Sequence, residues 1–166
     1  MAGFRYRIAA RPVALAIQAS AKLPLGYDVE PPAGEPPLGN GEGDADVKAL
    51  MGYSFYPVPV YVTGGVGIRA RGGDAENELL YEAEAGWSTP AFLAKITVDI
   101  VRSRGEIAAA GDFAAVTGEA DYTKLLPGIA ARIADGTWFT ADVIHVMDGK
   151  NTLAGTTFSI GVAYTK

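Results

Sequence analysis

The feature that most constrains this chain is a two-residue alternation of side chains that recurs along most of its length. Large apolar or aromatic residues occupy every second position, and small or charged residues lie between them. Successive side chains leave a β-strand on opposite faces, so this period predicts strands. The clearest segment sets Phe92, Ala94, Ile96, Val98 and Ile100 against Leu93, Lys95, Thr97, Asp99 and Val101.

Gly, Pro and Asp residues divide the alternating segments into about nine predicted strands. The connections are alternately short and longer, and the two longest are an acidic loop over 24–45 and a second loop over 103–121. Several predicted strands exceed the ~5–6 residues of an ordinary strand. The predicted strands cover 4–10, 13–23, 46–56, 60–71, 79–88, 92–101, 124–134, 138–147 and 157–165.

Composition alone is compatible with one soluble domain, since 49% of the 166 residues are hydrophobic and 20% are charged. No stretch approaches the roughly 18 uninterrupted apolar residues of a membrane helix. A transmembrane barrel, however, interleaves apolar and polar residues. Here the polar positions hold Gly, Ala, Ser, Thr and isolated charges, which suits strands between lipid and a watery lumen. We therefore expect residues 1–166 to form a single all-β domain, an antiparallel up-and-down transmembrane β-barrel.

The odd number of predicted strands does not fit a complete single-chain barrel. Bacterial single-chain barrels have an even number of strands, whereas nine is odd. Either the count is wrong by one, or strands before Met1 are missing and the chain is part of a larger even-stranded barrel. The N-terminal residues also lack a charged segment followed by an apolar one, so an exported protein would be a mature or truncated form.

Several function classes are disfavoured by composition. The chain has no cysteine, which excludes disulfides and thiol catalysis. Its net charge of −5 argues against nucleic-acid binding, which needs a basic face. We expect no enzymatic activity, no cofactor and no metal.

The aromatic residues gather beside the predicted short turns. Trp and Tyr concentrate at membrane interfaces, so this clustering favours a membrane-interface role. The alternative is that they form the core of a soluble β-sandwich. The candidate interface aromatics are Tyr53, Phe55, Trp87, Phe92, Trp138, Phe139 and Tyr164.

Short, turn-like motifs at 22–26, 39–46, 126–128, 148–151 and 161–164 follow one another along most of the chain. In this order they resemble a family of outer-membrane β-barrel proteins named as transporters of the phenol-degradation meta-pathway. The resemblance implies further strands before the first one seen here, and uptake of small, often aromatic or hydrophobic, compounds. It supplies no catalytic residues. The ending Tyr164-Thr165-Lys166 departs from the terminal aromatic residue usual in such barrels.

If the apolar faces meet lipid, the opposite faces line a lumen that carries charges of both signs. One reading is a selective pore; the other is a salt-bridge network that fills a narrow barrel. Arg69 and Arg71 are expected to face Glu82 and Glu84 across the hairpin. The candidate lumen or selectivity residues are Arg69, Arg71, Glu82, Glu84, Lys95, Asp99, Arg132 and Asp142.

Three other motifs are given structural interpretations. His145 lies three positions from Asp142, on the opposite face of a strand, and is read as an interfacial residue. The glycines around Gly65 and Gly67 resemble a dinucleotide fingerprint, but no helix is expected to follow them. The acidic loop lacks EF-hand spacing and is read as solvated, not as a Ca²⁺ site.

The sequence therefore predicts a channel in the bacterial outer membrane for passive passage of small solutes. Its expected partners are the lipid bilayer and a small-molecule solute, and a homo-oligomer or larger membrane assembly is left open. Two alternatives are a structural or interaction subunit anchored by its barrel, and a soluble lipocalin-like carrier with its apolar face turned inward.

Overall fold

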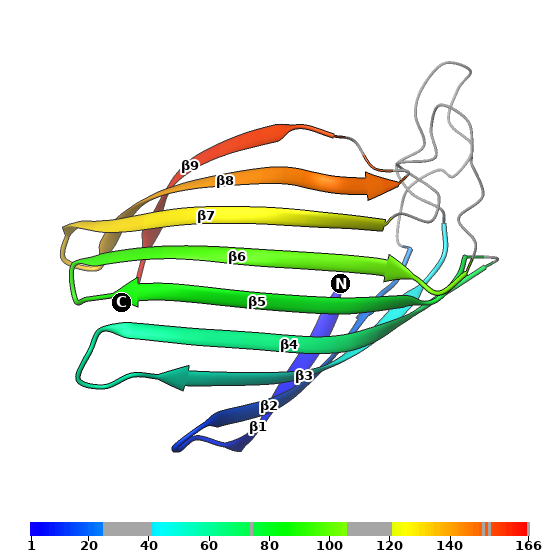
Figure 1. Cartoon of the computed structure of the whole chain (residues 1–166), viewed down its shortest axis with the longest axis horizontal. Helices are drawn as coiled ribbons and strands as arrows, with labels where there is room; N and C mark the ends of the chain where they lie inside the picture. Colours follow the sequence, from blue (N-terminus) through cyan, green and yellow to red (C-terminus); the bar gives the residue numbers. More distant parts are fainter. Residues whose placement is uncertain (25–40, 74, 106–120, 151, 153, 166) are drawn as a thin grey trace.

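The structure is a computed structural model that describes residues 1–24, 41–73, 75–105, 121–150, 152 and 154–165. This part of the chain folds into nine β-strands (Figure 1). All nine strands expected from the alternation are present, with ends that differ by a few residues. The strands are β1 (Ala2–Ala9), β2 (Ala14–Lys22), β3 (Asp44–Ser54), β4 (Val60–Arg71), β5 (Glu78–Ser88), β6 (Phe92–Ser103), β7 (Asp121–Ala134), β8 (Thr137–Lys150) and β9 (Thr156–Tyr164).

Each strand pairs with the next one along the chain, so the sheet is an antiparallel up-and-down meander in the order β1 to β9. The sheet curls until β1 and β9 lie behind the central strands (Figure 1). It does not close into the expected barrel, because β1 and β9 are its edges and do not pair. In an alternating series of nine strands the first and last run in the same direction, so a direct seam between them would have to be parallel.

The connections lie at two opposite ends of the sheet, as the sequence predicts. Segments 10–13, 55–59, 89–91 and 135–136 join strands at the left in Figure 1, and we call this the turn end. β2, β4, β6 and β8 end at the opposite end of the sheet, which we call the loop end. Asp135 and Gly136 form the shortest turn, where Gly136 has a φ of 68°, the left-handed conformation that two-residue hairpins require.

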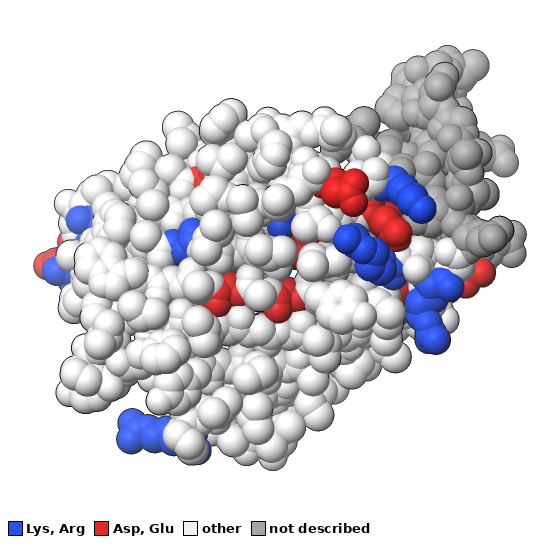
Figure 2. All heavy atoms as spheres, viewed as in Figure 1, with Lys and Arg blue, Asp and Glu red and all other residues white. Residues whose placement is uncertain are grey.

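The two faces of the sheet differ in the side chains that they carry. The convex face holds the large apolar residues, and many of them are exposed, including Val66, Ile68, Phe158 and Ile160. The concave face holds most of the charged and small residues, together with some apolar side chains such as Leu50 and Leu80. Figure 2 views the convex side, which is largely uncharged, with the largest group of charged side chains at the loop end.

Little of the apolar surface is buried within the chain. Among the described residues, Leu80 and Val101 are the buried apolar side chains, and they are neighbours on the concave face of β5 and β6. The accessible surface is 11,019 Å² for 17.3 kDa, whereas a compact soluble monomer of that mass exposes about 7,800 Å². The sheet therefore leaves its convex face without cover.

In the described residues, no helix is long and apolar enough to cross a membrane.

Candidate functional site

The concave face brings together the eight residues that the sequence selects as lumen candidates. Strand register aligns Gly65, Glu82, Asp99 and Lys124 in one row across β4 to β7. A second row, nearer the turn end, joins Gly86, Lys95, Gly128 and Asp142. Because alternate residues share a face, Arg69, Arg71, Glu84 and Arg132 lie on the same side as these rows.

Five charged residues form a cluster near the loop end, which we call the loop-end cluster (Lys22, Asp44, Arg69, Arg71, Glu78). The Glu78 carboxylate, 6% exposed, accepts hydrogen bonds from Arg69 Nη1 at 2.9 Å and Arg71 Nη1 at 3.1 Å. Asp44 accepts one from Lys22 Nζ at 3.4 Å and lies 3.7 Å from Arg71 Nε. Two carboxylates thus contact three cations, and these five residues come from four strands, β2 to β5.

The expected pairing of Arg69 and Arg71 with Glu82 and Glu84 is wrong. β5 begins at Glu78, a residue that the prediction left in the loop, and residues close to the end of β4 pair with residues close to the start of β5. Arg69 therefore lies opposite Glu78, whereas Glu82 lies opposite Gly65. Face parity was predicted correctly, but the register across the hairpin was not.

Glu82 instead pairs with a lysine two strands away. Lys48 Nζ of β3 donates a hydrogen bond to Glu82 Oε2 of β5 at 3.1 Å, passing over β4. Gly67 of β4 makes this reach possible, since a Cβ there would lie 2.7 Å from Lys48 Cγ and 2.6 Å from the Val47 carbonyl oxygen. A larger residue at Gly67 would displace the lysine.

Glu84 is the centre of a second cluster, which we call the Glu84 cluster (Tyr61, Glu84, Lys95, Thr97). Its carboxylate accepts hydrogen bonds from Tyr61 Oη at 2.8 Å, Thr97 Oγ1 at 2.7 Å and Lys95 Nζ at 3.1 Å. The Tyr61 ring occupies the space above Gly86, where a Cβ would collide with it. The three donors come from β4 and β6, the two strands that flank β5, and they hold this carboxylate in one position.

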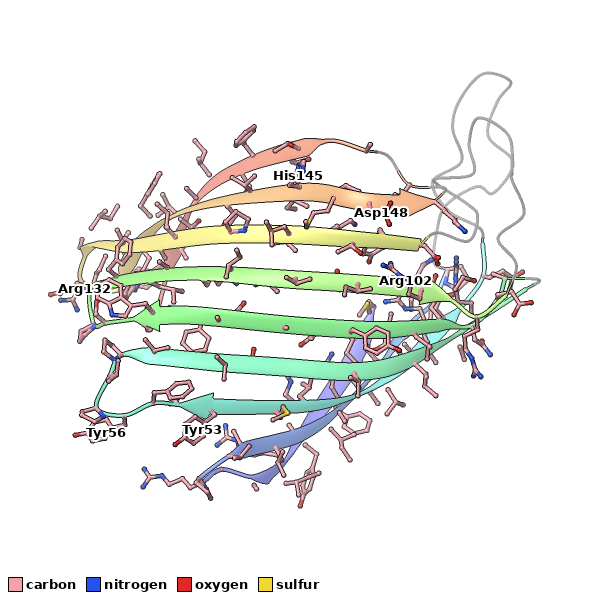
Figure 3. The ribbon with its side chains drawn as sticks, viewed as in Figure 1. Tyr53, Tyr56, Arg102, Arg132, His145 and Asp148 are labelled. Carbon is pink, nitrogen blue, oxygen red and sulfur yellow. The ribbon has the colours of Figure 1, made fainter. Side chains whose placement is uncertain are left out.

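The remaining lumen candidates are less tightly held. Asp99 lies opposite Lys124 in register, and the Lys124 ammonium lies 3.8 Å from the centre of the Tyr122 ring. Asp142 lies against Gly128 in the neighbouring strand. Arg132 is exposed at the turn end (Figure 3).

The candidate interface aromatics lie at the turn end, as their spacing predicts. Tyr53 and Phe55 contact each other edge to face with ring centres 4.9 Å apart, and Trp87 and Phe92 lie 5.7 Å apart. Tyr53 and Tyr56 are labelled at this end in Figure 3. Phe139 and Tyr164 point from the convex face, whereas Trp138 shares the concave parity of Asp142.

His145 and the other motifs with possible chemistry take structural positions. The His145 Nδ1 atom lies 2.9 Å from Thr156 Oγ1 on the convex face, opposite in parity to Asp142. The glycines at 65 and 67 lie inside β4 with no helix after them, as expected. The described residues contain no group of three or more potential metal ligands. Most of the acidic loop, residues 25–40, lies outside the described residues.

The sequence did not single out a pocket beside β1. This β1 pocket has a volume of about 360 Å³ and is lined by residues that include Arg5, Arg7, Ala14, Ala16, Gly52 and Thr63. Its lining overlaps that of a larger hollow of about 1,040 Å³ toward the turn end, which also contacts Ala14, Gly52 and Thr63. Small residues at matched register positions on β2, β3 and β4 were the available sequence signal.

Paired charges therefore fill one part of the concave face, at the loop-end cluster and the Glu84 cluster. Another part, at the β1 pocket and the adjoining hollow, has space for a small solute. Comparison with family models, curated proteins and solved structures gives no match. The family resemblance drawn from the sequence stays a prediction.

Proposed function

We propose that this chain is an outer-membrane β-barrel channel for passive passage of small solutes. In this proposal the sheet closes in the bilayer, the convex face contacts lipid and the concave face lines an aqueous lumen. The observation that carries the proposal is the exposure of large apolar side chains on the convex face of all nine described strands. Lipid-facing strands need such a surface, and their opposite faces are polar.

Strand length and aromatic placement give further support. Most of the strands have 9 to 14 residues, enough for a tilted transmembrane strand of about 9–11 residues. The aromatic residues at the turn end match the girdle that flanks the apolar band of such barrels. The hollow along β2 to β4 supplies a path through part of the lumen.

A soluble lipocalin-like carrier fits these features poorly. Such a carrier turns its apolar residues into a central cavity and its polar residues to water. Here the described charged residues Asp46 and Glu78 are buried on the concave face, whereas Ile160 and Phe158 are exposed on the convex face.

Reconstitution of the full chain in a planar bilayer tests the channel directly. We expect discrete conductance steps from protein folded in detergent and none from detergent alone. A protein that inserts into liposomes without conducting would favour the structural anchor, which needs a filled lumen. A protein that is monodisperse without detergent would contradict the membrane proposal.

The manner of closure can be tested separately because the chain has no native cysteine. Cysteine pairs, with one residue on β1 and one on β9, are introduced and oxidised after folding in liposomes. A cross-link within one chain indicates a direct parallel seam between the edges. Cross-links only between chains indicate that a second copy lies between β1 and β9.

A further inference from the structure

We propose that Arg5 and Arg7 form a binding site for a small organic carboxylate in the β1 pocket. This inference rests on the proposed channel function, because it takes the concave face as the path of the solute. It assigns a ligand class to that path.

The two arginines lie on the same face of β1 at positions two apart, with Arg5 opposite Gln18 and Arg7 opposite Ala16. Arg5 donates hydrogen bonds from Nε and Nη2 to Gln18 Oε1 at 3.0 and 2.6 Å. This neutral partner orients the guanidinium without neutralising it. The other N–H groups of Arg5 remain available, since a guanidinium has five donors.

Neither arginine has a carboxylate partner among the described residues. Glu82 also lines the β1 pocket, but Lys48 already balances its charge at 3.1 Å. The pocket therefore has an excess of positive charge. This differs from the loop-end cluster, where each carboxylate lies between cations.

The shape and lining of the pocket suit a carboxylate that has a short apolar body. Its volume of about 360 Å³ falls within the range of small-molecule sites. Guanidinium groups bind carboxylates through paired, charge-assisted hydrogen bonds. The methyl groups of Ala14 and Ala16 and the side chain of Leu50 offer apolar contact beside them.

The hollow at the turn end gives this pocket an approach route. The hollow is lined by Arg11 and by tyrosines such as Tyr61, and it shares Ala14, Gly52 and Thr63 with the pocket. An anion in the hollow would therefore pass small side chains at the junction before it reaches Arg5 and Arg7. No bulky side chain of the shared lining separates the two spaces.

The test measures equilibrium binding of butyrate to the detergent-folded full chain by ligand NMR line broadening, with n-butylammonium and inorganic phosphate as comparison ligands. We expect the parent to bind butyrate, to ignore butylammonium and to bind phosphate more weakly. Arg5→Gln/Arg7→Gln should weaken butyrate binding by roughly tenfold, since charge-assisted hydrogen bonds are lost. Arg104→Gln, which removes an exposed arginine beyond the end of β6, should leave it unchanged.

A second variant guards against simple misfolding. Arg5→Lys/Arg7→Lys keeps both charges and should retain more butyrate binding than the glutamine variant. Unchanged butyrate binding in the glutamine variant, or equal binding of phosphate and butyrate by the parent, would overturn the carboxylate site. Since binding is measured without conductance, a parent that binds butyrate but does not conduct would refute the channel alone. A parent that conducts but binds no butyrate would refute only this site.

Discussion

On the convex face, Ile160 and Phe158 are 78% and 76% exposed, whereas on the concave face the side chain of Glu78 is 6% exposed and hydrogen-bonded to two arginines. Soluble proteins show the opposite arrangement, with isoleucine and phenylalanine inside and carboxylates in water. The difference shows that the large apolar residues of this chain are not placed where the chain itself would bury them. We propose that the bilayer contacts this exposed convex face.

Removing a buried carboxylate from the loop-end cluster should cause the largest loss of stability. Glu78→Ala removes the carboxylate that lies between Arg69 and Arg71, so two cations lose a buried partner. We expect the free energy of unfolding to fall by about 3–5 kcal/mol, as when a buried ion pair is broken. Urea unfolding of the liposome-folded protein measures the change. Glu82→Ala is the matched control, because its half-exposed pair with Lys48 should cost far less.

An added charge tests the convex face. Val98→Arg places a guanidinium in the apolar stripe of β6 and should lower the free energy of unfolding by about 2–4 kcal/mol if the residue lies near the bilayer midplane. Thr63→Arg makes a comparable change on the concave face, opposite Glu84, and should be tolerated. The same unfolding assay compares them, and equal losses for both variants would remove the distinction between the faces.

A substitution at Gly67, where Lys48 crosses β4 to reach Glu82, should have a smaller effect on stability. Gly67→Val should push Lys48 away from Glu82, because any Cβ at this position meets Lys48 Cγ and the Val47 carbonyl oxygen. Overpacking of this kind typically costs about 1–3 kcal/mol in the free energy of unfolding. Gly64→Val, in the same strand, is a suitable glycine control, since its added Cβ would meet only the Glu82 carbonyl oxygen within 4 Å, at an ordinary contact distance of 3.5 Å. Equal stability of the parent and Gly67→Val would show that Lys48 does not depend on this glycine.

The ion preference of the conductance tests the charge pairs on the concave face, where the expected loss of stability is smallest. Glu82→Gln/Glu84→Gln leaves Lys48 and Lys95 without their carboxylates, so the conductance should shift toward anions. The loss of stability should stay near or below about 1 kcal/mol for each pair, because both remain partly in water. Reversal potentials in a salt gradient measure the shift. An unchanged preference would exclude these two pairs from selectivity.

The sequence predicted the strands and their faces well because both follow from local rules. Alternation of side chains around Val98 or Glu84 sets face parity without any knowledge of partners. Pairing along a hairpin depends on where the next strand begins, and because β5 begins at Glu78, this residue lies opposite Arg69 in place of Glu82. The local sequence therefore determines which face a side chain occupies, whereas it does not determine the register between two strands.

The site was predicted in part for the same reason. Lys48 and Glu82 come from strands that do not pair, so their contact depends on the missing side chain of Gly67 and cannot be seen in neighbouring residues. The β1 pocket arises where small residues from β2, β3 and β4 come into register. Closure of the sheet depends on two edges at opposite ends of the chain, and no local pattern specifies it.

Accessibility of single spin labels along β5 and β6 tests the central claim most directly. The chain has no native cysteine, so each label marks one position. In liposomes, labels at convex positions such as Ala83, Ala85, Ile96 and Val98 should collide more with oxygen, which concentrates in lipid. Labels at concave positions such as Glu82, Thr97 and Asp99 should collide more with a water-soluble nickel reagent. A two-residue alternation of the two signals is the predicted result, and a reversed alternation or none would contradict the account.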